Sequence, residues 1–149
     1  GTKTLFLDRF KTNSGLGILN PVHHSEQNER ATKECPFILN SGRILYQYHT
    51  STMSRRNKAL TDFANHSFVL MNPFDLEKNG FNDGDKVKLS NNRGKLETFI
   101  KSSDGVAEGE LFMPFHYSES QVNRLTRGEL DPYSKIPPFK YSACKVEKV

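Results

Sequence analysis

The stretch Lys86-Val87-Lys88-Leu89-Ser90-Asn91-Asn92-Arg93-Gly94-Lys95-Leu96-Glu97-Thr98-Phe99-Ile100-Lys101 carries the clearest structural pattern of the chain. Apolar residues recur at every second position on both sides of Asn91-Asn92-Arg93-Gly94. Such alternation places the apolar side chains on one face of a strand, and the residues between the two halves are typical of a tight turn. We therefore predict a β-hairpin over residues 86–101.

Further short apolar runs lie on both sides of this hairpin. We predict strands over four of them: Phe37–Leu39, followed by a loop at 40–42, then Ser67–Met71, Leu111–Met113 and Ser142–Val149. Asn72, Pro73 and Gly80 predict a short helix, because Asn caps a helix, Pro suits its first turn and Gly ends it. Residues 121–127 predict another. This pattern favours a β-barrel or sandwich with a few short helices.

The N-terminal part of the chain has a different character. Two short apolar patches, Leu5–Phe10 and Leu16–Leu19, are followed by the polar and charged stretch His23–Lys33. We expect residues 1–34 to form an extended segment or linker and residues 35–149 to form the compact domain.

Composition limits the classes of function. A chain of 149 residues with 35% hydrophobic content has room for one core, and its formal net charge is +4. That charge suits an anionic ligand or a mildly basic surface. Duplex nucleic acid is a poorer fit, because no helix carries a dense basic stripe. No window approaches the roughly 18 apolar residues of a membrane span. The compartment stays open between cytoplasm and periplasm.

The segment that follows the first predicted strand concentrates groups that bind anions. Gly42 would let a backbone N–H approach a phosphate, and Arg43 offers a forked guanidinium. The hydroxyls of Ser41, Thr50 and Thr52 are short donors. A polar surface loop has the same composition, however, and the segment is neither a Walker loop nor a GxGxxG motif.

Two further groups of residues are candidates for a binding surface. Phe115 and His116 follow a predicted strand that ends in proline, so they could line a pocket. Asn123 and Lys140 could bind the polar edge and the charge of a ligand. A metal site within this chain is not expected, because no ligands have the required spacing and the two cysteines, Cys35 and Cys144, form no Cys-x-x-Cys pair. We expect both cysteines to be small buried side chains.

The order of these motifs resembles one family. The shared motifs are Asn40-Ser41-Gly42-Arg43, Tyr48–Arg56, Met71-Asn72-Pro73, Gly84-Asp85, Arg93-Gly94, Phe112–His116, Asn123, Asp131-Pro132, Ser134–Pro137 and Phe139-Lys140. Together they resemble the C-terminal molybdopterin-dinucleotide-binding domain of the dimethyl sulfoxide reductase family, from about Pro36 to the C-terminus. The motifs Phe112–His116 and Ser134–Pro137 are more similar to formate dehydrogenase catalytic subunits than to periplasmic nitrate reductases.

The resemblance implies a mainly β fold, a double-psi β-barrel of the aspartate-decarboxylase type with a few short helices. It implies a bis(molybdopterin guanine dinucleotide) cofactor with molybdenum or tungsten, bound mainly by the rest of a parent chain. The metal ligand and any iron–sulfur cluster would lie outside this sequence. The domain would therefore bind the cofactor without being catalytic itself, next to the remaining domains and the electron-transfer subunits of the parent enzyme.

Carried over by position, the resemblance assigns cofactor contacts to thirteen residues: Ser41, Gly42, Arg43, Gln47, Tyr48, His49, Thr50, Thr52, Phe115, His116, Asn123, Phe139 and Lys140. Tyr48 departs from the family pattern, in which Trp is frequent, but it keeps a ring with a polar tip. Two alternatives remain: the same domain from a nitrate reductase or another family member, and a stand-alone β-barrel interaction module without a cofactor.

Overall fold

The computed structural model describes residues 2–24 and 29–149 of the chain. In these residues the elements are, in order, β1 (Phe37–Gly42), η1 (Ser54–Arg56), α1 (Lys58–Phe63), β2 (Phe68–Met71), α2 (Pro73–Asn79), β3 (Lys86–Ser90), β4 (Lys95–Ser102), β5 (Glu110–Pro114), η2 (Val122–Arg124) and β6 (Ser142–Lys148).

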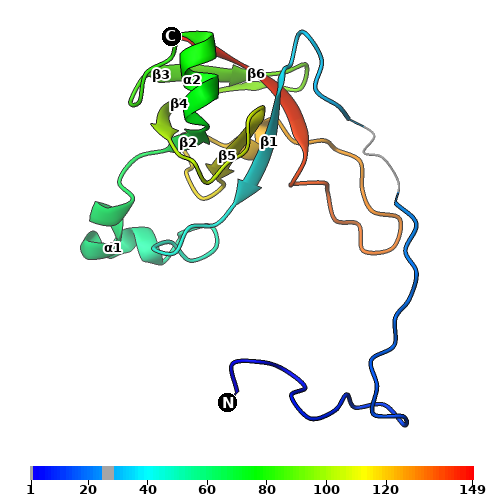
Figure 1. The fold of residues 1–149 in the computed structure, drawn as a ribbon. Helices are drawn as coiled ribbons and strands as arrows, with labels where there is room; N and C mark the ends of the chain where they lie inside the picture. Colours follow the sequence, from blue (N-terminus) through cyan, green and yellow to red (C-terminus); the bar gives the residue numbers. More distant parts are fainter. Residues whose placement is uncertain (1, 25–28) are drawn as a thin grey trace.

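The described strands close into a barrel in the order β1-β5-β2-β4-β3-β6 (Figure 1). Two of the pairings, β1 with β5 and β2 with β4, are parallel and join strands that lie far apart in the sequence. Closure leaves no free sheet edge, and the inward side chains, among them Leu39, Val69, Leu89 and Met113, fill the interior. The predicted fold class, a mainly β double-psi barrel with a few short helices, is confirmed.

The predicted hairpin is confirmed as β3 and β4, which pair from Lys86 opposite Phe99 to Ser90 opposite Lys95. The side chain of Asn91 closes the turn by accepting from the backbone N–H groups of Arg93 and Gly94 at 3.0 and 3.3 Å. The alternation in the sequence is therefore the alternation of buried and exposed faces on both strands.

The helix predicted after Asn72 is also confirmed, as α2. The Asn72 side chain accepts from the backbone N–H of Phe74 at 3.0 Å, and Pro73 occupies the first turn. Gly80 ends the helix in the left-handed conformation, with a φ of 67°. These signals are local, so the sequence was sufficient to find them.

Two local predictions were wrong, and one helix was missed. The loop predicted at 40–42 is strand, because β5 pairs with β1 as far as Gly42 opposite Pro114. The helix predicted over 121–127 is a single 3-10 turn at η2. It ends there because Leu125 is fully buried and its carbonyl accepts hydrogen bonds from the side chains of Asn91 and Arg93. Helix α1 was not predicted, although Asn57 caps it by accepting from Leu60 N–H at 3.2 Å.

Residues 2–24 run along an extended path away from the barrel, and their apolar side chains, including Leu7, Ile18 and Leu19, are exposed (Figure 1). Positions 25–28 of the predicted linker lie outside the described residues. The cysteines are both free; Cys144 is buried as predicted, whereas Cys35 is partly exposed.

Gly94 provides a test of the packing between the hairpin turn and η2. A Cβ at this position would lie 2.8 Å from the backbone oxygen of Arg124. We expect Gly94→Ala to lower the free energy of unfolding by about 1–3 kcal/mol, because a backbone oxygen in this position is not free to move aside. Urea unfolding followed by circular dichroism measures the change. Gly128→Ala is the matched control, since no atom lies within 4 Å of its Cβ position. Equal stability of the two variants would contradict this account.

Candidate functional site

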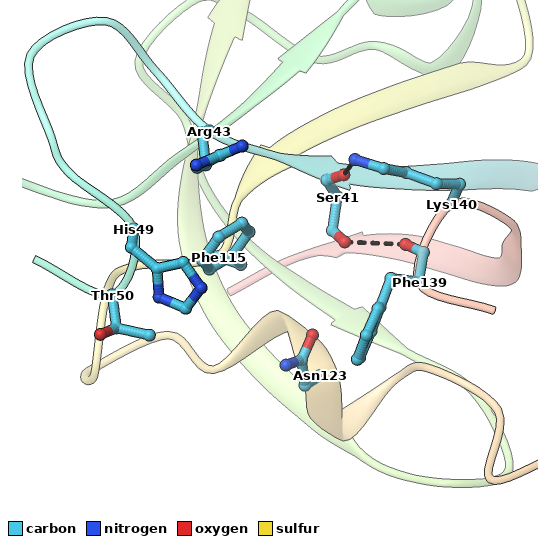
Figure 2. Close-up of a pocket in the computed structure, with 8 residues that line it drawn as sticks. All are labelled: Ser41, Arg43, His49, Thr50, Phe115, Asn123, Phe139 and Lys140. Atoms are coloured by element: carbon cyan, nitrogen blue, oxygen red, sulfur yellow. Dashed lines mark hydrogen bonds between the residues drawn. The ribbon is translucent and has the colours of Figure 1, made fainter. Parts of the chain in front are cut away.

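The ends of β1 and β5 open onto a cavity of about 400 Å³. Its lining residues come from four segments of the chain: Ser41 and Arg43, His49 and Thr50, Phe115 and Asn123, and Phe139 and Lys140. Figure 2 shows these side chains arranged around a common space, with Asn123 and Phe139 facing His49 and Phe115 across it. All eight were among the predicted site residues, and the structure brings them together.

The parallel pairing of β1 with β5 explains why two of these segments meet. Gly42 is opposite Pro114, and the N–H of Phe115 donates to the Gly42 carbonyl at 3.1 Å. When two parallel strands end at the same level, the residues that follow them lie at the same end of the barrel. Arg43 and Phe115 therefore leave the barrel next to each other.

The loop before β6 forms the opposite wall, and it is bonded to β1. The Ser41 hydroxyl donates to the Phe139 carbonyl at 2.7 Å, and the Lys140 ammonium donates to the Ser41 carbonyl (Figure 2). A lysine side chain that is held in this way loses less conformational freedom when it meets an anion. The positive charge is thus fixed at the edge of the cavity.

The loop after β1 contains two residues in an unusual backbone conformation. His49 and Ser51 have φ angles of 50° and 64°, in the left-handed region that glycine favours. Each such residue costs about 1–3 kcal/mol, and residues of this kind cluster at functional sites. The His49 ring meets the Phe115 ring edge-on at 5.7 Å, so the conformation of the loop places this imidazole in the cavity.

The charge of the cavity has one sign. Arg43 and Lys140 contribute cations, and no carboxylate is among the lining residues. The remaining groups are an amide, two hydroxyls and three rings. A site of this composition attracts an anionic ligand that has a planar part.

The structure does not bring the other predicted residues to this cavity. Gly42 adjoins it, but its missing side chain serves packing, because a Cβ there would lie 2.4 Å from the Phe112 ring. Gln47 is buried and accepts from the Ser54 hydroxyl at 2.7 Å. Tyr48 and Thr52 are exposed outside the cavity, and His116 is buried behind its wall.

Sequence reasoning missed an extension of this wall. An adjoining cavity shares Phe115 and Asn123 with the first and continues along Gln121 and Arg124. Arg124 Nε donates to Gln121 Oε1 at 3.1 Å, which orients a third cation near the site. No motif in the sequence signals that Gln121 and Arg124 extend the cavity.

His116 lies in an apolar and cationic environment. Its side chain is 4% exposed, it packs on Tyr117 at 3.8 Å between ring centroids, and its Nε2 has no partner among the described residues. Burial, assisted by the positive charge of Arg55, lowers the pKa of His116 from 6.5 to about 4. The imidazole is therefore neutral in the folded protein at neutral pH.

This depressed pKa predicts a pH dependence of stability. Between pH 6.5 and about 4 the unfolded chain takes up a proton at His116 that the folded chain does not. The contribution of His116 to stability is then complete above pH 6.5 and falls with decreasing pH, by up to about 3 kcal/mol. Urea unfolding at a series of pH values should show this loss, and His116→Gln should reduce it. An identical pH dependence in the variant would show that the imidazole does not titrate in this way.

Two further features concern residues 2–24 and 29–149, the part of the chain that the structure describes. Within them, no cluster of His, Cys, Asp and Glu side chains has the arrangement of a metal site. Nor is any helix in these ranges long and apolar enough to cross a membrane.

Comparisons with known proteins identify a domain family for this chain. The sequence profile of the molydopterin dinucleotide binding domain matches residues 37–143. The whole chain is 40% identical over 149 residues to the F420-dependent formate dehydrogenase 1 subunit alpha of Methanococcus maripaludis, and 40% identical over the same length to the F420-dependent formate dehydrogenase subunit alpha of Methanocaldococcus jannaschii. It spans 22% of the length of each relative.

A solved structure shows the same fold at lower sequence identity. Acetylene hydratase from Pelobacter acetylenicus superposes with a TM-score of 0.69 at 19% identity, over 78% of this chain and 19% of the hydratase chain. The matched profile covers nearly the whole barrel together with all of the cavity residues. The chain belongs to the molydopterin dinucleotide binding domain family.

Proposed function

We propose that this domain closes over a bis(molybdopterin guanine dinucleotide) cofactor in a larger oxidoreductase, and that the parent is the alpha subunit of a formate dehydrogenase. One observation carries the proposal: residues from separate segments of a chain of this family form a cationic, carboxylate-free cavity at one end of the barrel.

The groups in the cavity fit such a cofactor. Its diphosphate groups carry negative charge, which matches Arg43 and Lys140, and its pterin is planar, which matches the rings of His49, Phe115 and Phe139. Asn123 adds an amide that is both donor and acceptor, as the polar edge of a pterin or guanine requires. Because the cavity is an open wall on this chain, the rest of the parent would supply most of the contact surface.

Each residue has a distinct part in this proposal. The anchored Lys140 ammonium and the Arg43 guanidinium would neutralise the anion, and Asn123 would fix the orientation of a ring edge. Phe115 and Phe139 would exclude water from the face that they cover. The domain thus orients and encloses the cofactor, whereas the bound molybdenum or tungsten centre supplies the two-electron chemistry.

The parent reaction is proposed from the relatives. Both archaeal proteins are named as F420-dependent formate dehydrogenase alpha subunits. We propose that the parent converts formate to carbon dioxide, releasing a proton and two electrons that pass through partner subunits to F420.

The N-terminal segment supports a larger parent chain. Leu5, Leu7, Ile18, Leu19 and Val22 are all more than 60% exposed, which is unusual for so many apolar residues in one short segment. We propose that they pack on the domains that precede this one. These apolar side chains would then hold the barrel against the rest of the subunit.

Removal of one cation tests the cofactor site. In the full-length subunit, Lys140→Met keeps the apolar stem but removes the charge. We expect the dissociation constant of the cofactor to rise about tenfold, because one hydrogen bond to a charged group is lost. The measurement is guanine nucleotide per polypeptide after gel filtration. Lys78→Met in α2, outside the cavity, is the matched control. Equal nucleotide content in both variants would remove Lys140 from the site.

The substrate is tested separately with the purified parent enzyme. We expect electron transfer to an artificial acceptor with formate as donor, and no oxidation of reduced viologen by nitrate. Activity with nitrate alone would assign the domain to a nitrate reductase instead. A protein without any bound pterin would favour a barrel that serves only as an interaction module.

A further inference from the structure

A partly buried cluster of charges lies where the N-terminal segment meets the barrel. Glu29 is only 16% exposed, and its Oε1 accepts from Arg93 Nη2 at 2.8 Å. The same oxygen accepts from the backbone N–H of Ala143 at 2.9 Å. Its other oxygen lies 3.5 Å from Arg127 Nε, so that two guanidinium groups surround one carboxylate.

Through Arg93, this carboxylate is connected to the turn that carries Asn123. Arg93 Nε donates to the Leu125 carbonyl at 2.9 Å, and Asn91 Nδ2 donates to the same oxygen at 2.9 Å. Leu125 directly follows η2, the turn in which Asn123 lies. Gly94 allows the hairpin turn to approach the η2 backbone closely, as its position against the Arg124 oxygen shows.

Through Ala143, the same carboxylate is connected to the opposite wall of the cavity. Ala143 is three positions after Lys140, at the start of β6. Asn91 Nδ2 also donates to the Ala143 carbonyl at 3.0 Å, so both backbone groups of this residue are bonded within the cluster. The segments that present Asn123 and Lys140 are thus linked directly by Asn91 and also, through Arg93, by Glu29.

We propose that Glu29 is a positioning residue: by binding Arg93 and Ala143 N–H together, it holds Asn123 and Lys140 at the spacing that the cofactor requires. Glu29 is supplied by the segment that enters from the preceding part of the parent chain. Docking of that segment therefore sets the geometry of the cofactor wall. This inference rests on the proposed cofactor-binding function.

The charge balance explains why a carboxylate is needed at this point. The Arg93 side chain is 25% exposed and pairs with Glu29, whereas Arg127, 10% exposed, lies between Glu29 and Glu129. A guanidinium group of low exposure is costly without a counter-charge, so Arg93 depends on Glu29. Without Glu29, Arg93 would be drawn toward solvent, and the Leu125 carbonyl would lose one of its two donors. The turn at η2 would then be held to β6 by the Asn91 side chain without the support of Arg93 and Glu29.

The experiment uses the full-length holoenzyme and compares Glu29→Ala with Glu147→Ala. Glu147 is a matched control, because it pairs with Lys88 and Lys145 on the barrel strands and touches neither η2 nor the cavity. We expect Glu29→Ala to accelerate cofactor release about tenfold, because a displaced Asn123 or Lys140 would lose the equivalent of one hydrogen bond between the cofactor and a charged group. The rate is followed by the fluorescence of the released, oxidised pterin, and thermal unfolding of both variants is recorded in parallel.

Faster release in Glu29→Ala but not in Glu147→Ala, at similar thermal midpoints, would support the proposal. Equal release rates would overturn it. If Glu29→Ala does not fold, Glu29→Gln decides, because its amide oxygen still accepts from Ala143 N–H but lacks the charge. Release at the wild-type rate in that variant would overturn the requirement for charge. Absence of any pterin from the wild-type enzyme would instead refute the proposed function.

Discussion

The parallel ladder between β1 and β5 determines where the site residues lie. Because Gly42 and Pro114 are opposite each other, the chain leaves both strands at one level, and Arg43 and Phe115 begin adjacent loops. The hydrogen bond from Phe115 N–H to the Gly42 carbonyl continues the ladder one residue beyond the last pair. A slip of one residue would turn every side chain of β1 to the other face, so the core and the site depend on the same register.

Electrostatics then defines what the site can accept. Arg43 and Lys140 line one cavity without a carboxylate among its lining residues, and the Lys140 ammonium is directed by the Ser41 carbonyl. Like charges in a concave surface raise the local potential, and an anion that enters lowers it. Elsewhere on the barrel, cations such as Lys86 and Lys88 are paired with Glu97 and Glu147. The cavity therefore differs from the rest of the basic surface because no carboxylate lies among its lining residues.

Local signals predicted the elements that depend on neighbouring residues. The 86–101 hairpin and α2 each contain their own turn or cap, so the sequence was sufficient for both. The end of β1 and the length of η2 depend on partners far away in the sequence, Pro114 and the Asn91–Arg93 turn, and were predicted wrongly. Ordered motifs located the cavity residues, but spacing could not show that Gln47 turns inward to Ser54.

Part of the cavity wall is held in place by hydrogen bonds within the domain, and this has an energetic consequence. Ser41 is bonded to Phe139, Lys140 to Ser41, and Ala143 to Glu29. Groups that are already ordered cost less entropy on binding. A single wall nevertheless covers only part of a large ligand, so the loss of translational freedom is poorly offset by this domain alone. High affinity therefore requires a second surface, held in register with the first. In the proposed parent enzyme, the segment that carries Glu29 would be the covalent connection through which a preceding domain imposes that register.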